Sequence, residues 1–295
     1  MPLTPPQILR LDALALGPKL ENLGGAEPGN LCSSFGGFGG SRPFLLNLGW
    51  GAGHAVFGQT DYLGRCGVNF GIGTGPLVIE LWVKLPVVPL PNSHRQAVLF
   101  DYAKDPSTYG NNLMIWYQLD FKIRFNDVAS YSPVTSGASF PSLWDGNWHH
   151  IAVTRKEVSG DCKYDFYHDG SAVGSTQARS GTQSCPEVSD GGCVTLGQNQ
   201  VSECSGFSAQ YALAKSVGTG SLSEVRVWNT WRSQPTILAS KDVRMDETEA
   251  GLAAAWPLDC QHYYDDLLGN ADLSGCSPAS PSSTLPSFAT EGLES

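Results

Sequence analysis

The side chains in this sequence that could do chemistry include a pair of adjacent histidines. His149 and His150 stand inside segment 148–155, which reads as a strand. Successive side chains of a strand point to opposite faces of a sheet, so these two imidazoles cannot bind one metal ion. We therefore expect packing or hydrogen-bonding roles for both.

Acidic side chains are the second group that could take part in catalysis or metal binding. Glu80 and Glu224 are each the single acid of an apolar run, whereas four acids close together predict a solvated loop: Asp242, Asp246, Glu247 and Glu249. The motifs G-x-S-x-G and H-E-x-x-H and a Walker loop do not occur in the sequence. It therefore offers no signature of a serine hydrolase, a zinc protease or a nucleotide-binding enzyme.

The charge balance excludes two further classes of partner. Lys and Arg number 18 against 28 Asp and Glu, a net charge of −10, and no basic cluster occurs. A nucleic-acid groove or a patch for anionic membranes is not expected. No run of 18 apolar residues occurs, so no membrane span is predicted.

Eight cysteines are spread singly along the 295 residues. An even number without a CxxC pair favours disulfides over zinc, and thus an extracellular or cell-surface location. The N-terminus lacks the features of a secretory signal, so we expect a removed leader or a chain cut from a longer one. Short loops and elimination suggest one of many pairings: Cys185–Cys193, Cys260–Cys276, Cys32–Cys66 and Cys162–Cys204.

The elements that must position these residues read as strands. In segment 77–85 the odd positions are apolar and the even ones include Glu80 and Lys84, which predicts one buried and one wetted face. Similar runs predict strands at 119–125, 148–155, 164–168, 193–197 and 222–228. Asp169-Gly170 predicts a tight hairpin, and Ser233 with Pro235 predicts a short helix over 236–241. The fold class is all-β, a two-sheet antiparallel β-sandwich.

Composition divides the chain into three parts. Residues 1–43 form a Gly/Pro-rich N-terminal arm, residues 44–276 one continuous strand-rich domain, and residues 277–295 a Ser/Pro-rich tail.

Six segments in order resemble the laminin-G-like and pentraxin-like jelly rolls of the concanavalin A-like lectin/glucanase superfamily. They are 70–84, 145–153 (DGNWHHIAV), 167–170 (YHDG), 196–200 (LGQNQ), 220–229 (GSLSEVRVWN) and 251–258 (GLAAAWPL). The resemblance implies two packed sheets, one of them concave, with binding loops along an edge. The inter-strand cysteine pair of the pentraxins is replaced here by Glu80 and Ala152.

The superfamily also contains glycoside hydrolases, which carry paired carboxylates as E-x-D-x-x-E or E-x-D-x-E on one strand face. A retaining mechanism needs the two carboxyls about 5–5.5 Å apart. Neither motif occurs in this sequence, so an enzyme is not expected.

The pentraxin resemblance also locates a calcium-dependent edge. Its ligand positions correspond here to Asn111 and Asn112, then Asn199, Gln200 and Val201. Asn111, Asn199 and Val201 stand where the family has the carboxylates that calcium prefers, although Asp105 or Glu203 could compensate. The expected calcium ligands are therefore Asp105, Asn112, Gln200 and Glu203, with no cofactor as the leading expectation.

The same loops suggest where a ligand would bind. Amides beside an aromatic ring suit sugar hydroxyls and an apolar sugar face, which selects Tyr109, Asn111, Asn112, Asn199 and Gln200. The alternative is that these amides only satisfy the loop backbone.

The function expected from these features is a non-catalytic extracellular or surface module that recognises a glycan or a protein surface. The first alternative is a structural subunit of a larger assembly or oligomer, such as a cell wall, an appendage or a virion coat. A glycoside hydrolase is the second alternative.

Overall fold

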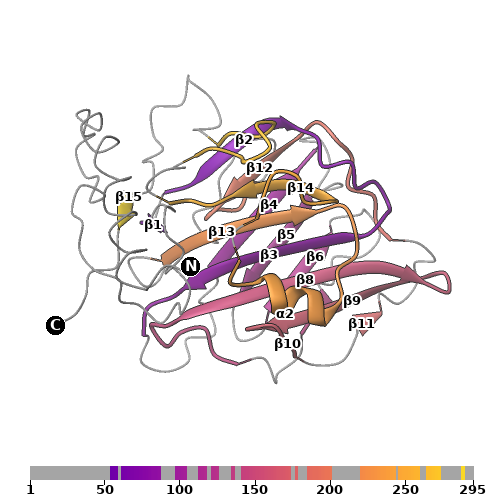
Figure 1. The fold of residues 1–295 in the computed structure, drawn as a ribbon, viewed down its shortest axis with the longest axis horizontal. Helices are drawn as coiled ribbons and strands as arrows, with labels where there is room; N and C mark the ends of the chain where they lie inside the picture. Colours follow the sequence, from indigo (N-terminus) through magenta and orange to yellow (C-terminus); the bar gives the residue numbers. More distant parts are fainter. Residues whose placement is uncertain are drawn as a thin grey trace, which may run out of the picture.

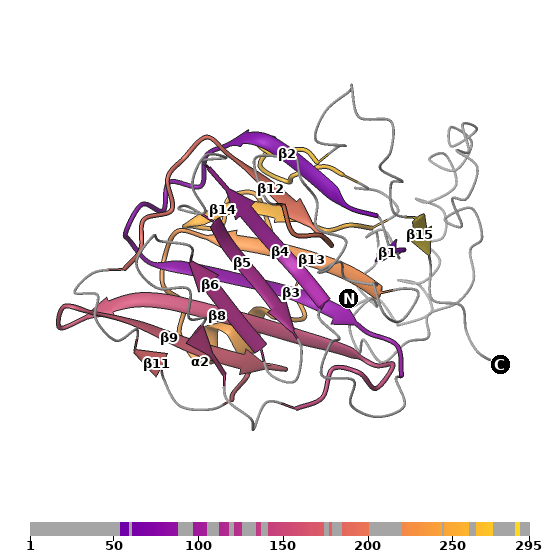
Figure 2. The same cartoon turned by 180° about the vertical axis from the view of Figure 1, so that it is seen from behind.

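The computed structural model describes residues 54–58, 61–87, 97–104, 112–117, 121–125, 134–136, 141–173, 177–178, 185–200, 220–243, 245–259, 264–273 and 287–289. Over these residues the chain forms two antiparallel sheets, with a short helix on the outside of one sheet (Figures 1 and 2). The predicted two-sheet β-sandwich is confirmed. No helix in these ranges is long and apolar enough to cross a membrane.

The larger sheet, sheet A, has nine strands within the described ranges. Its main path runs through β10 (Ser171–Ala172), β9 (Asp161–His168), β8 (Trp148–Val158), β3 (Leu77–Lys84), β13 (Gly220–Trp228), β1 (His54–Phe57) and β15 (Ser287–Ala289). β11 (Gln177–Ala178) pairs with β9, and β14 (Leu252–Trp256) pairs with β13. Through β15, three residues of the Ser/Pro-rich segment 277–295 join the sheet.

The second sheet, sheet B, has six strands in the part of the chain that the structure describes, and Figure 2 shows it in front. Its order is β2 (Leu63–Val68), β12 (Gly192–Leu196), β4 (Ala97–Ala103), β5 (Asn112–Tyr117), β6 (Phe121–Phe125) and β7 (Val134–Thr135). The six strands predicted from sequence correspond to β3, β6, β8, β9, β12 and β13, with small shifts at their ends.

The main core lies between the sheets and follows the alternation of β3. Leu77, Ile79, Leu81 and Val83 are at most 1% exposed and belong to one apolar cluster with residues of sheet B such as Tyr102. The tight hairpin predicted at Asp169-Gly170 joins β9 to β10. Both residues have positive φ, 50° and 79°, as a two-residue turn of the favoured hand requires.

The outer face of β3 is not wetted as its sequence suggests. Glu80 is fully buried and Trp82 is 6% exposed. Helix α2 (Gln234–Ser240) lies on this side of sheet A (Figure 1), capped by Ser233 as predicted. Its Ile237 packs against Ala152 and Tyr167, so a second apolar layer covers this face.

Three of the suggested disulfide pairings are wrong. Cys66 bonds to Cys193, not Cys32, because antiparallel pairing of β2 with β12 sets the two residues opposite each other. Cys162 bonds to Cys185, so Cys162–Cys204 and Cys185–Cys193 are both excluded. The short-loop argument failed because sheet register, rather than sequence distance, decides which cysteines meet. Cys32, Cys204 and the suggested pair Cys260–Cys276 lie outside the described residues.

Candidate functional site

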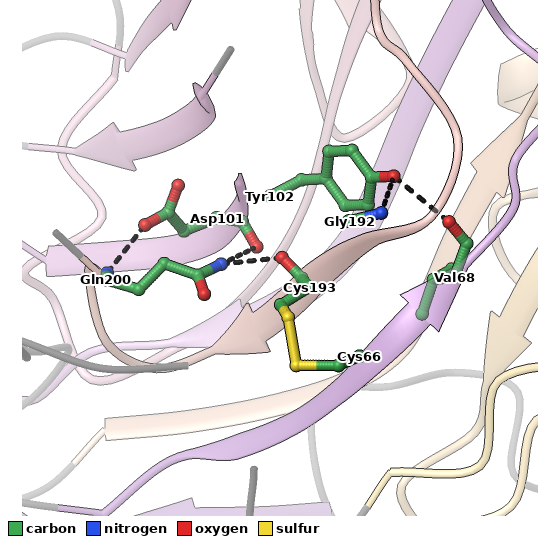
Figure 3. Close-up of a disulfide and its surroundings, with 7 residues drawn as sticks. All are labelled: Cys66, Val68, Asp101, Tyr102, Gly192, Cys193 and Gln200. Atoms are coloured by element: carbon green, nitrogen blue, oxygen red, sulfur yellow. Dashed lines mark hydrogen bonds between the residues drawn. A yellow bond between two sulfur atoms is a disulfide. The ribbon is translucent and has the colours of Figure 1, made fainter. Parts of the chain in front are cut away.

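Of the two segments expected to form the ligand site, residues 197–200 lie against β4 of sheet B, near the end of β4 and the start of β5, which we call the edge of this sheet. After β12 the chain reverses at Gly197, and the backbone N–H of Gln200 donates to Asp101 Oδ2 at 2.7 Å (Figure 3). Asp101 belongs to β4, and Asn112 begins β5 opposite Ala103, two residues further along. A hydrogen bond between residues 99 apart therefore holds the 197–200 segment beside β4.

The side chain of Gln200 is used within the fold. Its Nε2 donates to the carbonyl oxygen of Cys193 at 2.6 Å, and the residue is fully buried. Asn199 beside it is 6% exposed. Among the predicted site residues, Gln200 therefore positions the segment, while Tyr109, Asn111, Asp105 and Glu203 lie outside the described residues.

A tyrosine and a disulfide brace this edge from β4 and β2. The Tyr102 hydroxyl accepts from the Gly192 backbone N–H at 2.8 Å and lies 3.0 Å from the carbonyl oxygen of Val68 (Figure 3). The Cys66–Cys193 disulfide links the neighbouring strands directly. The start of β12 is thus linked to both of its neighbouring strands, β4 and β2, and these links hold this part of sheet B together.

The acids that a hydrolase mechanism would use are committed to internal contacts. Glu80 Oε1 accepts from the Trp228 indole N–H at 2.9 Å and lies 3.6 Å from Arg226 Nη1. Its Oε2 lies 3.6 Å from His150 Nε2. Glu224, the other candidate, pairs with the same Arg226 at 3.1 Å.

These contacts set the charge of Glu80. Burial by itself raises the pKa of this carboxyl, but hydrogen bonding to His150 and the charge of Arg226 outweigh it and lower the pKa to about 2. A carboxylate that stays ionised and has no exposed surface cannot protonate a glycosidic oxygen. Glu80 therefore has a structural role: through His150, Arg226 and Trp228 it connects β3 to β8 and β13.

The adjacent histidines face opposite sides of sheet A, as predicted. His150 faces Glu80, whereas His149 contacts Asp169 at 3.2 Å and Asp145 at 3.1 Å. The hydrogen bond to Asp169 raises the pKa of His149, burial lowers it, and Asp145 raises it further. This second group of side chains was not expected from the sequence, although the Asp169-Gly170 turn that carries Asp169 was predicted.

Known proteins resemble parts of this chain in sequence. A 117-residue segment, 40% of the chain, is 30% identical to the sushi, von Willebrand factor type A, EGF and pentraxin domain-containing protein 1 of Rattus norvegicus and 28% identical to its Mus musculus counterpart. The match spans only 3% of the length of each relative.

Two solved structures are similar to this chain at low identity. A heptameric SAP-like pentraxin from Limulus polyphemus matches with a TM-score of 0.42 and 19% identity, over 68% of this chain and 82% of that one. The CBM40 module of a Ruminococcus gnavus sialidase, bound to sialyllactose, matches with a TM-score of 0.40 and 11% identity, over 63% of this chain and 95% of that one.

A laminin G family model matches residues 57–238, more than half of the chain, and this range contains the paired strands from β2 to β13 together with the braced edge of sheet B. The order of strands, the sandwich and this match lead to one assignment: the chain belongs to the concanavalin A-like lectin/glucanase superfamily.

Proposed function

We propose that this protein is a non-catalytic extracellular recognition module that binds a glycan at the edge of sheet B beside Asp101 and Gln200. The observation that carries the proposal is the 2.7 Å hydrogen bond from Gln200 N–H to Asp101. It holds the 197–200 segment next to β4, two residues before Ala103, and Ala103 pairs with Asn112 at the start of β5. The proposed site adds the amides and Tyr109 of segment 105–112, which the sequence places between these two strands.

The chemistry of these residues suits a sugar. Asparagine side chains both donate and accept hydrogen bonds, as paired sugar hydroxyls require, and a tyrosine ring packs against an apolar sugar face. In this proposal Asn112 and Asn199 contact the ligand. Gln200 keeps the segment in place through Cys193 and is a positioning residue.

The burial and ion pairs of Glu80 and Glu224 support a non-catalytic role. Glu80 is buried and held ionised, and Glu224 is paired with Arg226. A glycosidase needs a second carboxyl that can carry a proton at working pH. Glu80 does not offer one, because it stays ionised.

The described residues carry few of the ligands that calcium takes, which are six to eight oxygen atoms with several carboxylates among them. Of the four expected calcium ligands, only Gln200 has a described side chain, and its Nε2 donates to the carbonyl oxygen of Cys193. In this proposal binding does not require calcium.

Disulfides support the extracellular part of the proposal. All four described cysteines are in bonds, Cys66–Cys193 and Cys162–Cys185, which persist in oxidising compartments.

A glycan array with the full chain tests the proposal, run with calcium and with a chelator. We expect binding in both conditions, and its loss in the double variant Asn112→Ala/Asn199→Ala, whose fold is checked by circular dichroism because Asn199 is only 6% exposed. Asn270→Ala is the matched control, because it removes an exposed amide from a distant turn. Retained binding in the double variant refutes the site. A chain that binds no glycan on the array refutes glycan as the ligand and leaves a protein surface as the alternative.

A further inference from the structure

Two histidines and two aspartates gather where β8 begins and β9 ends, on sheet A and outside the edge described above. In the register of this pair, His168 lies opposite Ile151, and His149 lies two residues from Ile151 on the same strand. The two histidines therefore share one face of the sheet as diagonal neighbours. Their ring centroids are 4.7 Å apart.

Asp169 brings a carboxylate oxygen to both imidazoles. Its Oδ2 lies 3.2 Å from His149 Nδ1 and 3.5 Å from His168 Nδ1. One donor atom from each of the three residues lies within 4.8 Å of the others. A tetrahedral zinc ion with bonds of about 2.0–2.2 Å separates its ligand atoms by roughly 3.3–3.6 Å. The two contacts of the carboxylate match that spacing.

The Asp169 carboxylate is held in this orientation before any ion arrives. Its Oδ1 accepts from the backbone N–H of His150 at 2.8 Å, which leaves Oδ2 directed at the two rings. The backbone N–H of Asp169 also donates to the carbonyl oxygen of His150 at 2.7 Å, which holds the turn that it forms with Gly170.

Asp145 supplies the outer support that metal-binding histidines commonly have. Both of its oxygens lie 3.1 Å from His149 Nε2, the nitrogen that faces away from Asp169. Asn147 in turn holds Asp145 through its backbone N–H and its side-chain amide. A carboxylate on the far nitrogen orients the ring and increases its basicity as a ligand.

The charge and exposure of the group also suit a cation. With neutral imidazoles, Asp145 and Asp169 leave two negative charges close together, which a divalent ion balances. The histidine side chains are 12% and 14% exposed and that of Asp169 is 41% exposed, so solvent can supply a fourth ligand. Two imidazoles and one carboxylate favour zinc-class transition ions over calcium or magnesium.

We propose that His149 Nδ1, His168 Nδ1 and Asp169 Oδ2 bind a divalent transition-metal ion of the zinc class, with Asp145 as a positioning residue and water as the fourth ligand. The alternative arrangement is a protonated His149 held between Asp145 and Asp169 without any ion.

Isothermal titration of the chelator-treated full chain with zinc chloride, under non-reducing conditions, tests the site. We expect one zinc per chain and no heat from calcium chloride. His168→Ala should abolish zinc binding, and Asp145→Asn should weaken it about 10–100-fold. Asp246→Ala, a change at an exposed acid outside the group, should bind zinc as the unmodified chain does.

A second measurement needs no variant and so remains decisive if His168→Ala does not fold. Zinc should protect His149 and His168 from modification by diethylpyrocarbonate, read by mass spectrometry of the digested chain. Absence of zinc binding, unchanged binding in His168→Ala, or equal modification of both histidines with and without zinc overturns the proposal.

Discussion

The indole N–H of Trp228 donates a 2.9 Å hydrogen bond to Oε1 of Glu80, joining β13 to β3 on the outer face of sheet A. Glu80 stands opposite Ala152 of β8 in the register. In the pentraxins that the sequence resembles, this pair of positions carries an inter-strand disulfide. Here the same neighbourhood is held by an ionised carboxylate between Trp228, Arg226 and His150.

Replacing Glu80 by Ala should destabilise the fold strongly. Arg226 is 2% exposed, and the substitution removes the fully buried one of its two carboxylate partners, Glu80, while Glu224 remains. It also removes the acceptor of the Trp228 N–H. Breaking a buried ion pair in this way costs about 3–5 kcal/mol of the free energy of unfolding. Urea denaturation measures the loss, with Glu247→Ala as the exposed-acid control. Equal midpoints for the two variants would show that the network contributes nothing.

Acid should remove the stabilisation that Glu80 provides. The pKa of Glu80 is about 2 in the folded chain and 4.5 without the fold, so its contribution is complete above pH 4.5. It declines as the pH falls from 4.5 towards 2, by about 3 kcal/mol in total. Denaturation of the native chain and of Glu80→Gln between pH 5 and pH 2.5 tests this. The stability difference between them should shrink with falling pH, and a constant difference would contradict the assignment.

The burial of Glu80 also marks the limit of what the sequence can predict. Alternation in segment 77–85 correctly placed Ile79 and Leu81 inside, because period two follows from strand geometry alone. The same pattern suggested a wetted outer face. The elements that cover it, Ile237 of α2 and Trp228 of β13, lie about 150 residues later, beyond any local pattern.

Short sequence motifs correctly predicted the features that depend on only a few adjacent residues. Ser233 caps α2, and Asp169 with Gly170 makes the β9–β10 turn, because each depends on a few adjacent residues. Contacts between distant residues were missed. The His149–His168 group requires the register of two strands, which the sequence leaves open.

The two disulfides should contribute unequally to stability. Cys66–Cys193 closes a loop of 127 residues, whereas Cys162–Cys185 closes one of 23. Constraint of the unfolded chain gives about 5 kcal/mol for the longer loop and about 3 kcal/mol for the shorter. Double Cys→Ala variants of each pair, compared by urea denaturation, measure both values. Mass spectrometry of an unreduced digest should identify both linkages, and a Cys185–Cys193 peptide would refute the pairing.

Gly197 should be intolerant of any side chain, because two separate constraints act on it. Its φ is 86°, a region that strains other residues, and an added Cβ would lie 2.5 Å from Cδ1 of the Phe57 ring. Gly269 isolates the first constraint, since its φ is 70° and an added Cβ meets nothing within 4 Å.

We therefore expect Gly269→Ala to cost about 1 kcal/mol of stability and Gly197→Ala clearly more, because Phe57 is fully buried and cannot move aside. Gly197→Ala should also shift the Gln200 backbone away from Asp101. Hydrogen exchange at the Gln200 amide reports this directly: its protection should fall in Gly197→Ala and stay unchanged in Gly269→Ala. If both variants lose the same stability and keep that protection, steric contact with Phe57 does not hold the turn that leads from β12 to Gln200.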